Sequence, residues 1–376
     1  MEKRAVCVSC FDFYDHRVEL VMDQLRSQGY QCTYITGDFS HFTQQKYTIS
    51  VPGGEQVPTI PYYRNMSAAR LASHHFFAKA VFKRVREIKP QVLYLMVPPN
   101  SLALRGGNYK KKHPEVRLIL DLYDLWPETF PNGRIKKLAA LPFKLWGLMR
   151  DQGLKRADLI YSECDLYRQV LKKQLAGKET RLLPICRAAA TTGPEPVAPS
   201  CSELSLCYLG SIGNLLDIQA LTELLRQMMK LRPVVFHIIG EGETRAEVIR
   251  AAEDTGARVI YYGRIYDPDR RQEIFDKCHF GINIMKTDVC VGLTMKSLDY
   301  FAGGLPIINS IEADTRRLIR KYDAGIELNR NDIAKTAREA VEMTAERNTE
   351  MRRNTLRMFE DHFSVAHVRG ILSELK

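Results

Sequence analysis

Residues 204–213 read LSLCYLGSIG, a short apolar run that ends at a glycine. The same arrangement returns twice, where Val234–Ile239 runs into Gly240-Glu241-Gly242 and where Arg258–Tyr262 stops at Gly263. Helix-like segments follow the first two runs, at about 217–230 and 245–253. Strands that alternate with helices are typical of βαβ units and a parallel sheet. The second half of the chain is therefore expected to form a Rossmann-like domain.

The first half shows the same alternation, with helices expected at about 16–28 and 67–87 and strands at 5–9, 30–34, 91–96, 116–121 and 158–162. Between the halves, residues 191–200 read TTGPEPVAPS, which is typical of an extended linker because proline and glycine interrupt regular structure. We therefore expect four segments: an N-terminal domain over 1–190, a linker over 191–203, a C-terminal domain over 204–360, and a C-terminal helix over 361–376 that could return to the first domain.

The composition is that of a globular protein. The chain has 376 residues, too many for one ordinary core, with 45% apolar and 26% charged residues. No apolar run approaches the roughly 20 residues that span a bilayer. The start, MEKRAVCVSC, lacks the long apolar region and the cleavage site of a signal peptide. These observations favour a cytosolic or peripheral protein.

The cysteines and the net charge narrow the possible partners and sites. Nine scattered cysteines favour a reducing compartment over a disulfide framework. Cys7 and Cys10 have C-x-x-C spacing, but no second pair completes a zinc site, so core packing is expected for both. The formal net charge of +11 leaves nucleic acid, an anionic membrane surface or phosphorylated substrates as partners.

Three carboxylates follow a predicted strand in residues 121–130, which read DLYDLWPETF. They could cap a following helix, or they could mark a ligand site, because α/β sheets bind ligands beyond the carboxyl ends of their strands. Asp121 ends the strand and is expected to tie down the loop. Pro127 suits the first turn of a helix, and Glu128 suits the positive end of that helix. Asp124 is then left without a structural task.

A second informative stretch is residues 290–310, CVGLTMKSLDYFAGGLPIINS. A loop with Gly292 and Thr294 leads into a short helix that carries Lys296 and Asp299, which are three positions apart and can share one helical face. A cation in the first turn does little for the helix but suits a diphosphate, and Asp299 could accept from ribose hydroxyls. The alternative is a surface ion pair worth at most about 1 kcal/mol.

The order and spacing of several motifs resemble the family 4 retaining glycosyltransferases of the GT-B fold. The motifs are YLGS (208–211), IGEGE (239–243), YGR (262–264) and KSLDYFAGGLPII (296–308). The Asp-Leu-Trp-Pro-Glu core at 124–128 is similar to members that build bacterial cell-surface polysaccharides such as capsule. The resemblance implies an α/β architecture of two Rossmann-like domains whose parallel sheets face a central cleft.

The resemblance also implies roles for individual residues. The C-terminal domain would hold a nucleotide-diphosphate sugar, UDP-linked, and the N-terminal domain the acceptor, with no metal and no cofactor. Asp124 and Lys296 would be catalytic. The implied donor-binding residues are Gly210, Ser211, Gly213, Gly240, Gly242, Arg264, Ile265, Tyr266, Gly292, Leu293, Thr294, Lys296 and Asp299. The implied residues on the acceptor side are Asp12, Asp15, Trp126 and Glu128.

The activity implied by the resemblance is metal-independent hexosyl transfer with retention, to a lipid-linked or polysaccharide acceptor, in cell-surface polysaccharide biosynthesis. Val291 stands where the family usually has the first of two spaced glutamates, and Ser211 and Asp217 stand where it often has basic residues. The alternative is therefore a non-catalytic GT-B subunit that binds sugar or nucleotide and supports a partner glycosyltransferase. The absence of G-x-G-x-x-G after the first strand argues against an oxidoreductase, and no nucleic-acid-binding module is recognisable.

A basic stretch, PNGRIKKLAALPFKLWGLMRDQGLKR, occupies residues 131–156 and interleaves lysines and arginines with leucines, Phe143 and Trp146. Basic amphipathic helices of this kind lie on anionic membranes. A helix that packs on the core and solvates its basic face is the alternative. The lipid-linked acceptor implied by the resemblance favours the membrane, so we expect a cytoplasmic protein that is peripheral on the inner face of the cell membrane.

Overall fold

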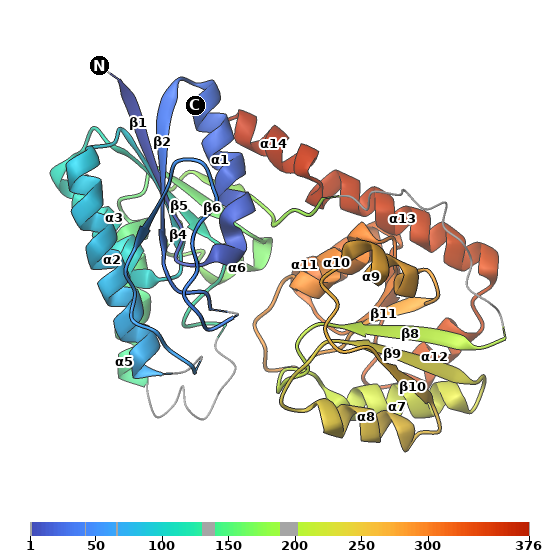
Figure 1. The fold of residues 1–376 in the computed structure, drawn as a ribbon. Helices are drawn as coiled ribbons and strands as arrows, with labels where there is room; N and C mark the ends of the chain where they lie inside the picture. The colour runs from blue at the N-terminus through green and yellow to red at the C-terminus, as the bar shows by residue number, and fades with distance from the viewer. Residues whose placement is uncertain (1, 42, 65–66, 130–139, 189–201, 376) are drawn as a thin grey trace. The chain divides into compact units, whose positions relative to one another are not determined.

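The computed structural model describes residues 2–41, 43–64, 67–129, 140–188 and 202–375. The chain divides into two compact units, one comprising Met1–Ile185 with Val368–Lys376 and the other comprising Cys186–His367. The linker expected over 191–203 lies almost entirely outside the described residues. Each unit is a parallel sheet with helices on both faces (Figure 1).

In the described part of the first unit, the sheet has seven strands in the order β3-β2-β1-β4-β5-β6-β7, and all neighbours are parallel. The strands are β1 (Lys3–Val8), β2 (Tyr30–Gly37), β3 (Gly54–Val57), β4 (Val92–Val97), β5 (Arg117–Leu122), β6 (Leu159–Ser162) and β7 (Thr180–Leu182). The helices are the 3-10 helix η1 (Asp12–Tyr14), α1 (Asp15–Ser27), α2 (Ala68–Ile88), α3 (Asn100–Lys112), α5 (Ala140–Leu154), α6 (Asp165–Val170) and α14 (Val365–Ser373).

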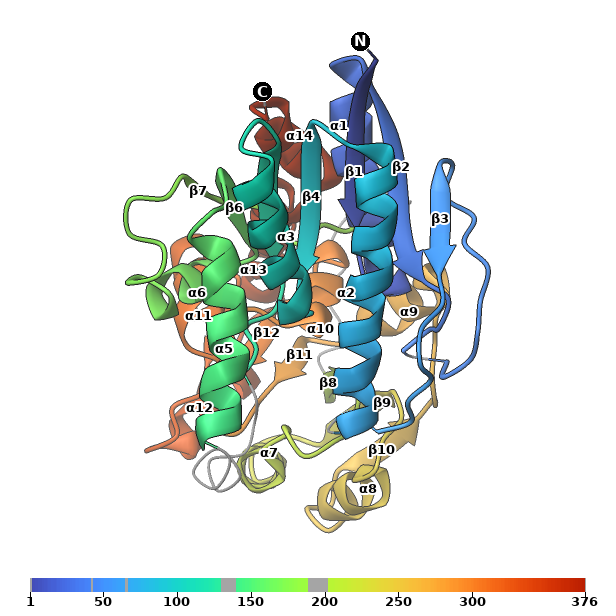
Figure 2. The same cartoon turned by 90° about the vertical axis from the view of Figure 1, so that its left-hand side faces the viewer.

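The central strands of this sheet are buried on both faces. All six residues of β4 are buried, as are the last four of β1, which is typical of parallel sheets covered by helices. Helices α2, α3 and α5 lie on one face, and α1 and α14 lie on the other (Figures 1 and 2). From Val368 onward α14 packs with this unit, where Arg369 lies 3.3 Å from Asp23.

The described part of the second unit has a six-stranded parallel sheet in the order β10-β9-β8-β11-β12-β13. Its strands are β8 (Leu204–Leu209), β9 (Val234–Ile239), β10 (Arg258–Tyr261), β11 (Phe280–Asn283), β12 (Ile307–Asn309) and β13 (Gly325–Glu327). Its helices are α7 (Ile218–Met229), α8 (Arg245–Glu253), α9 (Pro268–Phe275), α10 (Met295–Ala302), α11 (Ala313–Tyr322), α12 (Ile333–Val341) and α13 (Ala345–Phe363).

Local sequence explains where the helices begin and which side they bury. Asp217 caps α7 and Thr294 caps α10, each accepting from a backbone N–H three positions further on. The buried residues of α7 recur at helical spacing, with Leu221, Leu225 and Met228 in the core. In Figure 1, α7, α8 and α12 cover one face of the sheet, and α9, α10, α11 and α13 cover the other.

The structure confirms the parallel α/β alternation in both halves. Three short edge strands, β3, β7 and β13, were not expected, because three or four partly exposed residues carry too little periodicity to reveal a strand. Residues 126–129 form a turn, and the rest of the helix predicted after Pro127 falls on residues 130–139, which lie outside the described part of the chain. Cys7 and Cys10 are buried and free, as core packing requires. None of the described helices is both long enough and apolar enough to cross a membrane.

A buried ion pair joins separate elements of the first unit. Arg17, on α1, donates from Nε and Nη2 to both carboxylate oxygens of Asp121, on β5, at 2.6 and 2.8 Å. Its guanidinium also donates to the backbone carbonyls of Leu183 and Pro184 at 2.6 and 2.9 Å. The hydroxyl of Tyr94, on β4, donates to the same carboxylate. Asp121 therefore ties a helix and two strands to the segment that follows β7.

Replacing Asp121 with Ala should lower the free energy of unfolding by about 3–5 kcal/mol, because the Arg17 guanidinium would stay buried without its partner. Chemical denaturation measures this change. Glu55→Ala, which breaks the exposed Arg84–Glu55 pair at 2.6 Å, is the matched control and should cost no more than about 1 kcal/mol. Equal losses for the two variants would show that the buried pair has no special weight.

Candidate functional site

The strand order of the second unit defines a switch point between β8 and β11. From β8 the chain proceeds outward through β9 and β10, and then returns to β11 on the other side of β8. Ligands of open α/β sheets bind beyond the carboxyl ends of the strands at such a point. The turn Gly210-Ser211 follows β8 there, and α10 follows the loop after β11.

Lys296, in the first turn of α10, packs over the Gly210 turn. A Cβ placed on Gly210 would lie 3.9 Å from the Cβ and Cδ atoms of Lys296, and Gly210 has a φ of 117°. The Lys296 ammonium lies 4.5 Å from the centre of the Tyr208 ring, a cation–π contact. The Tyr208 hydroxyl donates to the carbonyl of Ser211 at 2.7 Å, so the tyrosine holds both the cation and the turn.

Burial lowers the pKa of Lys296 from 10.5 to about 8. Within the described part of the chain, no carboxylate lies within ion-pair distance of its ammonium. A cation held partly out of water without a counter-ion is electrostatically unfavourable by itself. It gains free energy when an anion binds beside it, which is what a diphosphate would do.

Gly240 and Gly242 lie where two loops pack too closely to leave room for a side chain. A Cβ on Gly240 would lie 1.9 Å from the carbonyl oxygen of Gly210, and one on Gly242 would lie 2.1 Å from that of Ile212. Backbone hydrogen bonds join the same loops, from the Gly210 N–H to Ile239 and from the Ile212 N–H to Glu241, both at 2.9 Å. These two glycines let the loops after β8 and β9 touch, and their contact with a donor stays a prediction.

Asp299 forms ion pairs with arginines, so the alternative of a surface ion pair between Asp299 and Lys296 is wrong. Its Oδ1 accepts from Arg187 Nε at 3.1 Å and lies 3.7 Å from Arg271 Nη2. Neither arginine was anticipated, because they lie 112 and 28 positions away. The Oδ2 atom has no partner among the described residues.

Some of the remaining residues predicted to bind the donor are buried or hydrogen-bonded within the protein, and others are exposed. The carbonyl of Gly292 accepts from the N–H and the hydroxyl of Thr315, at 2.9 and 2.7 Å, and Leu293 is buried. Gly213 lies in the loop between β8 and α7. After β10, Arg264 is exposed, Ile265 is buried and Tyr266 is 79% exposed.

In the first unit, Asp124 does have a structural task, which corrects the expectation. Its Oδ1 accepts from the backbone N–H of Leu125 and from the hydroxyl of Thr129, both at 2.7 Å. Burial raises the pKa of Asp124 above its usual value, although these hydrogen bonds act in the opposite direction. The carboxylate therefore holds the turn at 126–129, and its catalytic role stays a prediction.

Glu128 serves α5. Its two carboxylate oxygens accept from Arg150 at 2.6 and 2.9 Å, and the side chain of Arg150 is 1% exposed. Arg150 also donates to the carbonyl of Trp126 at 3.2 Å. The pair fixes the turn at 126–129 against α5. Arg150 therefore does not belong to the basic face of the 131–156 stretch, either towards a membrane, as predicted, or towards solvent, as in the alternative.

Asp12 and Asp15 follow β1, at the carboxyl edge of the first sheet. The hydroxyl of Tyr34 donates to Asp15 at 2.6 Å, and burial raises the pKa of Asp15 to about 6. The Oδ1 atom of Asp12 is buried and has no hydrogen-bond partner among the described residues. Both carboxylates lie at an edge where α/β sheets bind ligands.

Trp126 has two neighbours that the sequence reasoning missed. The guanidinium of Arg70 lies 4.4 Å from the indole centre, and the ring of His74 stacks on the indole at 5.9 Å and 20°. Both residues lie on α2, four positions apart and so on one face. That spacing was the available signal, but nothing local connects it to Trp126.

The described residues contain no group of three or more His, Cys, Asp or Glu side chains arranged to hold a metal ion.

Comparison with known proteins adds two findings. Residues 205–346 match a family model described as glycosyl transferases group 1. Among solved structures, sucrose-phosphate synthase from Thermosynechococcus elongatus aligns with a TM-score of 0.72 at 11% identity, over 99% of this chain and 98% of that one. WaaG, a glycosyltransferase involved in lipopolysaccharide biosynthesis, aligns with a TM-score of 0.66 at 12% identity, over 98% of both chains.

Anabaena HepE in complex with UDP aligns with a TM-score of 0.67 at 10% identity, over 99% of both chains. No curated protein matches the sequence. The fold is GT-B. The two Rossmann-like halves of this GT-B chain were expected from the resemblance, and at these identities the structural matches establish the architecture alone.

The family match covers every donor-side residue of the GT-B chain that the sequence singled out, from Gly210 to Asp299. It does not extend to the first unit, which holds Asp124. The match and the GT-B fold together support a glycosyltransferase.

Replacing Lys296 with Met should weaken binding of UDP far more than binding of uridine, because the variant loses the cation and keeps the apolar stem. Isothermal titration with each ligand measures the two losses. Equal losses for UDP and uridine would contradict a phosphate role.

The stability of the same variant shows whether it still folds around the site. Because the pKa of Lys296 falls from 10.5 to about 8 on folding, the unfolded chain binds one more proton between these values. Wild-type stability should therefore rise relative to Lys296→Met as the pH increases from 8 to 10.5. Below pH 8 the Met variant should be the more stable protein by a constant margin.

Proposed function

We propose that this protein transfers a hexose from a UDP-linked sugar to a lipid-linked or polysaccharide acceptor, with retention and without a metal, in cell-surface polysaccharide biosynthesis. The observation that carries the proposal is Lys296, a partly buried cation over the Gly210 turn, in the region that matches the group 1 model. Among the described residues its ammonium has no carboxylate within ion-pair distance. The HepE structures, described as complexes with UDP and with UDP-glucose, support a UDP-linked donor.

In the proposed mechanism, negative charge develops on the leaving diphosphate as the bond to the sugar breaks. The Lys296 ammonium and the Ser211 backbone N–H stabilise that charge, since the N–H groups of Gly210 and Ile212 already donate to Ile239 and Glu241. One such fixed donor is typically worth about 3–4 kcal/mol. The leaving phosphate accepts the proton of the acceptor hydroxyl on the same face of the sugar. This route gives retention without a protein nucleophile.

Asp299 is the proposed ribose ligand. Arg187 occupies its Oδ1, and Oδ2 can accept from a ribose hydroxyl. Arg264, Ile265 and Tyr266 are proposed to meet the base, with the exposed Tyr266 ring as a stacking surface. Asp124 is proposed to face the reacting sugar from the acceptor side, where a carboxylate stabilises positive charge on the ring.

A second candidate function is a non-catalytic subunit that binds sugar or nucleotide and supports a partner glycosyltransferase. Val291, an apolar residue where the family usually has an acidic one, favours it. Release of UDP from UDP-sugars by the isolated protein, with and without an acceptor, distinguishes the two functions.

We also propose that the stretch at 131–156 rests on an anionic membrane at the inner face of the cell. Residues 130–139, with Arg134, Lys136 and Lys137, lie outside the described part of the chain. In the described part, Lys144 is exposed, and Leu141 and Leu145 are 67% and 56% exposed. Exposed leucines beside a lysine on one helix suit a bilayer interface.

Asp124→Asn should fold normally, bind UDP like the wild type, and lose sugar transfer by at least about a hundredfold, roughly 2.7 kcal/mol of barrier. Asparagine keeps the Oδ1 acceptor that holds the turn and loses the charge. Transfer from radiolabelled UDP-sugars measures the effect.

The control for that experiment is Thr129→Val, which removes one hydrogen bond to Asp124 and leaves its carboxylate in place. If the Val variant loses as much transfer as the Asn variant, the carboxylate acts by holding the turn rather than by its charge.

Replacing Lys136, Lys137 and Lys144 with Glu should abolish binding to vesicles that contain anionic lipid, while the melting temperature changes little. Each lysine near such a surface contributes about 1 kcal/mol. Co-sedimentation measures binding, with Lys172, Lys173 and Lys178 replaced by Glu as a control of equal charge. If the variant with Glu at 136, 137 and 144 co-sediments with the vesicles as well as the wild type does, the membrane proposal is overturned.

A further inference from the structure

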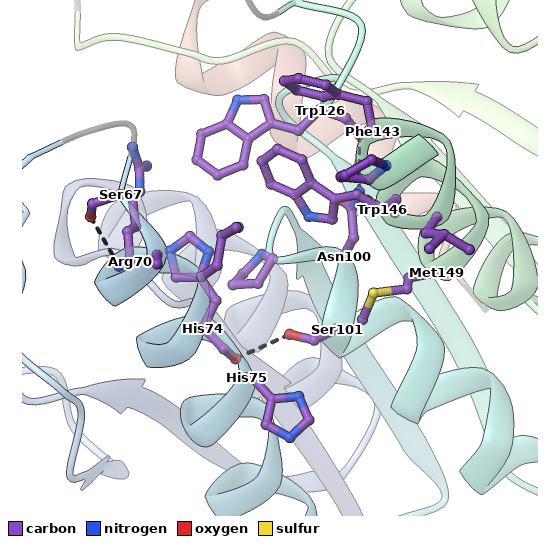
Figure 3. A pocket seen from close by; sticks show the side chains of 15 residues that line it. Ser67, Arg70, His74, His75, Asn100, Ser101, Trp126, Phe143, Trp146 and Met149 are labelled. Atoms are coloured by element: carbon purple, nitrogen blue, oxygen red, sulfur yellow. Dashed lines mark hydrogen bonds between the residues drawn. The ribbon is translucent and has the colours of Figure 1, made fainter. Parts of the chain in front are cut away.

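The first unit contains a pocket of about 610 Å³ between α2 and α5 (Figure 3). Such a volume is within the usual range of small-molecule sites, about 300–1,000 Å³. The walls come from the first turns of α2 and α3, the turn that follows β5, and α5. The lining residues are Ser67, Ala68, Arg70, Leu71, His74, His75, Pro99, Asn100, Ser101, Trp126, Pro142, Phe143, Leu145, Trp146 and Met149.

Aromatic rings form one side of this α2–α5 pocket. The indole centres of Trp126 and Trp146 lie 5.5 Å apart, and Phe143 lies 6.1 Å from Trp146. Figure 3 shows these three rings side by side, with the His74 side chain beyond them on α2. Leu145 and Met149 extend the apolar wall along α5.

Much of the hydrogen-bonding capacity of the polar lining is already used by the protein. The Ser101 hydroxyl donates to the carbonyl of His74 at 3.0 Å, and the Ser67 hydroxyl caps α2. The side-chain amide of Asn100 donates to the carbonyls of Trp126 and Trp146, both at 3.0 Å. Besides Asn100 Oδ1, mainly the carbon atoms of these side chains are therefore left for a ligand to contact.

Besides the guanidinium of Arg70, which lies over the Trp126 ring, the polar lining includes two buried atoms without a hydrogen-bond partner in the described part of the chain, His74 Nε2 and Asn100 Oδ1. A sugar ring carries several hydroxyls, and each one left unpaired in an apolar site costs free energy. Two partners suit a ligand with one hydrogen-bonding group and a long apolar portion.

The surface beside the pocket is apolar as well. Leu141, Leu145 and Leu148 recur at spacings of four and three on α5 and are 67%, 56% and 43% exposed. Leu71, which lines the pocket from α2, is 48% exposed. Leu145 belongs to both the exposed stripe and the lining, so the stripe is continuous with the pocket.

We propose that the α2–α5 pocket binds the hydrocarbon chain of the lipid that carries the acceptor, with the stripe of α5 leucines against the bilayer from which the chain enters. The identity of that lipid as the acceptor rests on the proposed function. Each buried CH₂ contributes about 0.8 kcal/mol, so a chain of this kind anchors the acceptor without any contact to its sugar.

Intrinsic tryptophan fluorescence can report ligand binding in this pocket. Both tryptophans of the chain, Trp126 and Trp146, line the pocket. Titration with monomeric stearate brominated in the middle of its chain should quench the intrinsic fluorescence and reach saturation. Unbrominated stearate and a polyprenyl phosphate should relieve the quenching by competition, and methyl glucoside should not.

Two variants of the exposed stripe separate the pocket from the surface. Leu145→Asp places a charge in the pocket and should weaken the quenching by at least about tenfold in Kd. Leu148→Asp changes the same stripe outside the lining. With this variant the Kd for monomeric stearate should stay within about twofold of the wild-type value, well below the tenfold change expected for Leu145→Asp.

Quenching that does not saturate, that methyl glucoside relieves, or that both variants weaken equally would overturn the proposal. Relief by stearate but not by polyprenyl phosphate would overturn the assignment to the acceptor lipid. Because quenching needs no donor sugar, a protein that shows the expected quenching and transfers no sugar would contradict the proposed function and leave the pocket assignment standing.

Discussion

The first unit depends on one buried charge pair, Arg17 with Asp121. Both side chains are almost completely withdrawn from water, at 6% and 0% exposure, so each would be strongly unfavourable without the other. Their hydrogen bonds join α1, β4 and β5 to the carbonyls of Leu183 and Pro184, which end the first half of the chain. Because Asp121 holds the end of β5, the turn that carries Asp124, Trp126 and Glu128 leaves the sheet from a fixed point.

Both units carry charged side chains at the carboxyl edge of their sheet, but these side chains differ in how they are paired. In the first unit the carboxylates of the turn already have partners within the protein: Glu128 forms an ion pair with Arg150, and Asp124 accepts from the neutral hydroxyl of Thr129. In the described part of the second unit, Lys296 lies beside an aromatic ring and a glycine turn, and no carboxylate there is within ion-pair distance. Carboxylates that are already bonded within the protein hold the turn in place, whereas a cation without a carboxylate nearby favours an anionic ligand. That difference matches the proposed division between acceptor and donor sides.

Much of the fold and part of the site could be predicted from the sequence. The long apolar strands and the caps at Asp217 and Thr294 are local signals, and they located most of the elements. The short strands β3, β7 and β13 were missed because three or four residues show no clear period. Among the site residues, Lys296 and the Gly210 turn were anticipated together, since both follow from strand-end glycines and a helix start. The partners of Asp299, Glu128 and Trp126 were not.

By itself the sequence determined the α/β class, the division into two halves and the glycine turns, because strand period, helix caps and backbone freedom depend on residues a few positions apart. Only the tertiary structure decided which charges are paired. Arg187 meets Asp299 across 112 positions, and Arg17 meets Asp121 across 104. It also placed Trp126 and Trp146 in one pocket and left Lys296 without a carboxylate partner among the residues that the structure describes. These outcomes depend on which elements become neighbours in space, and no local pattern encodes that.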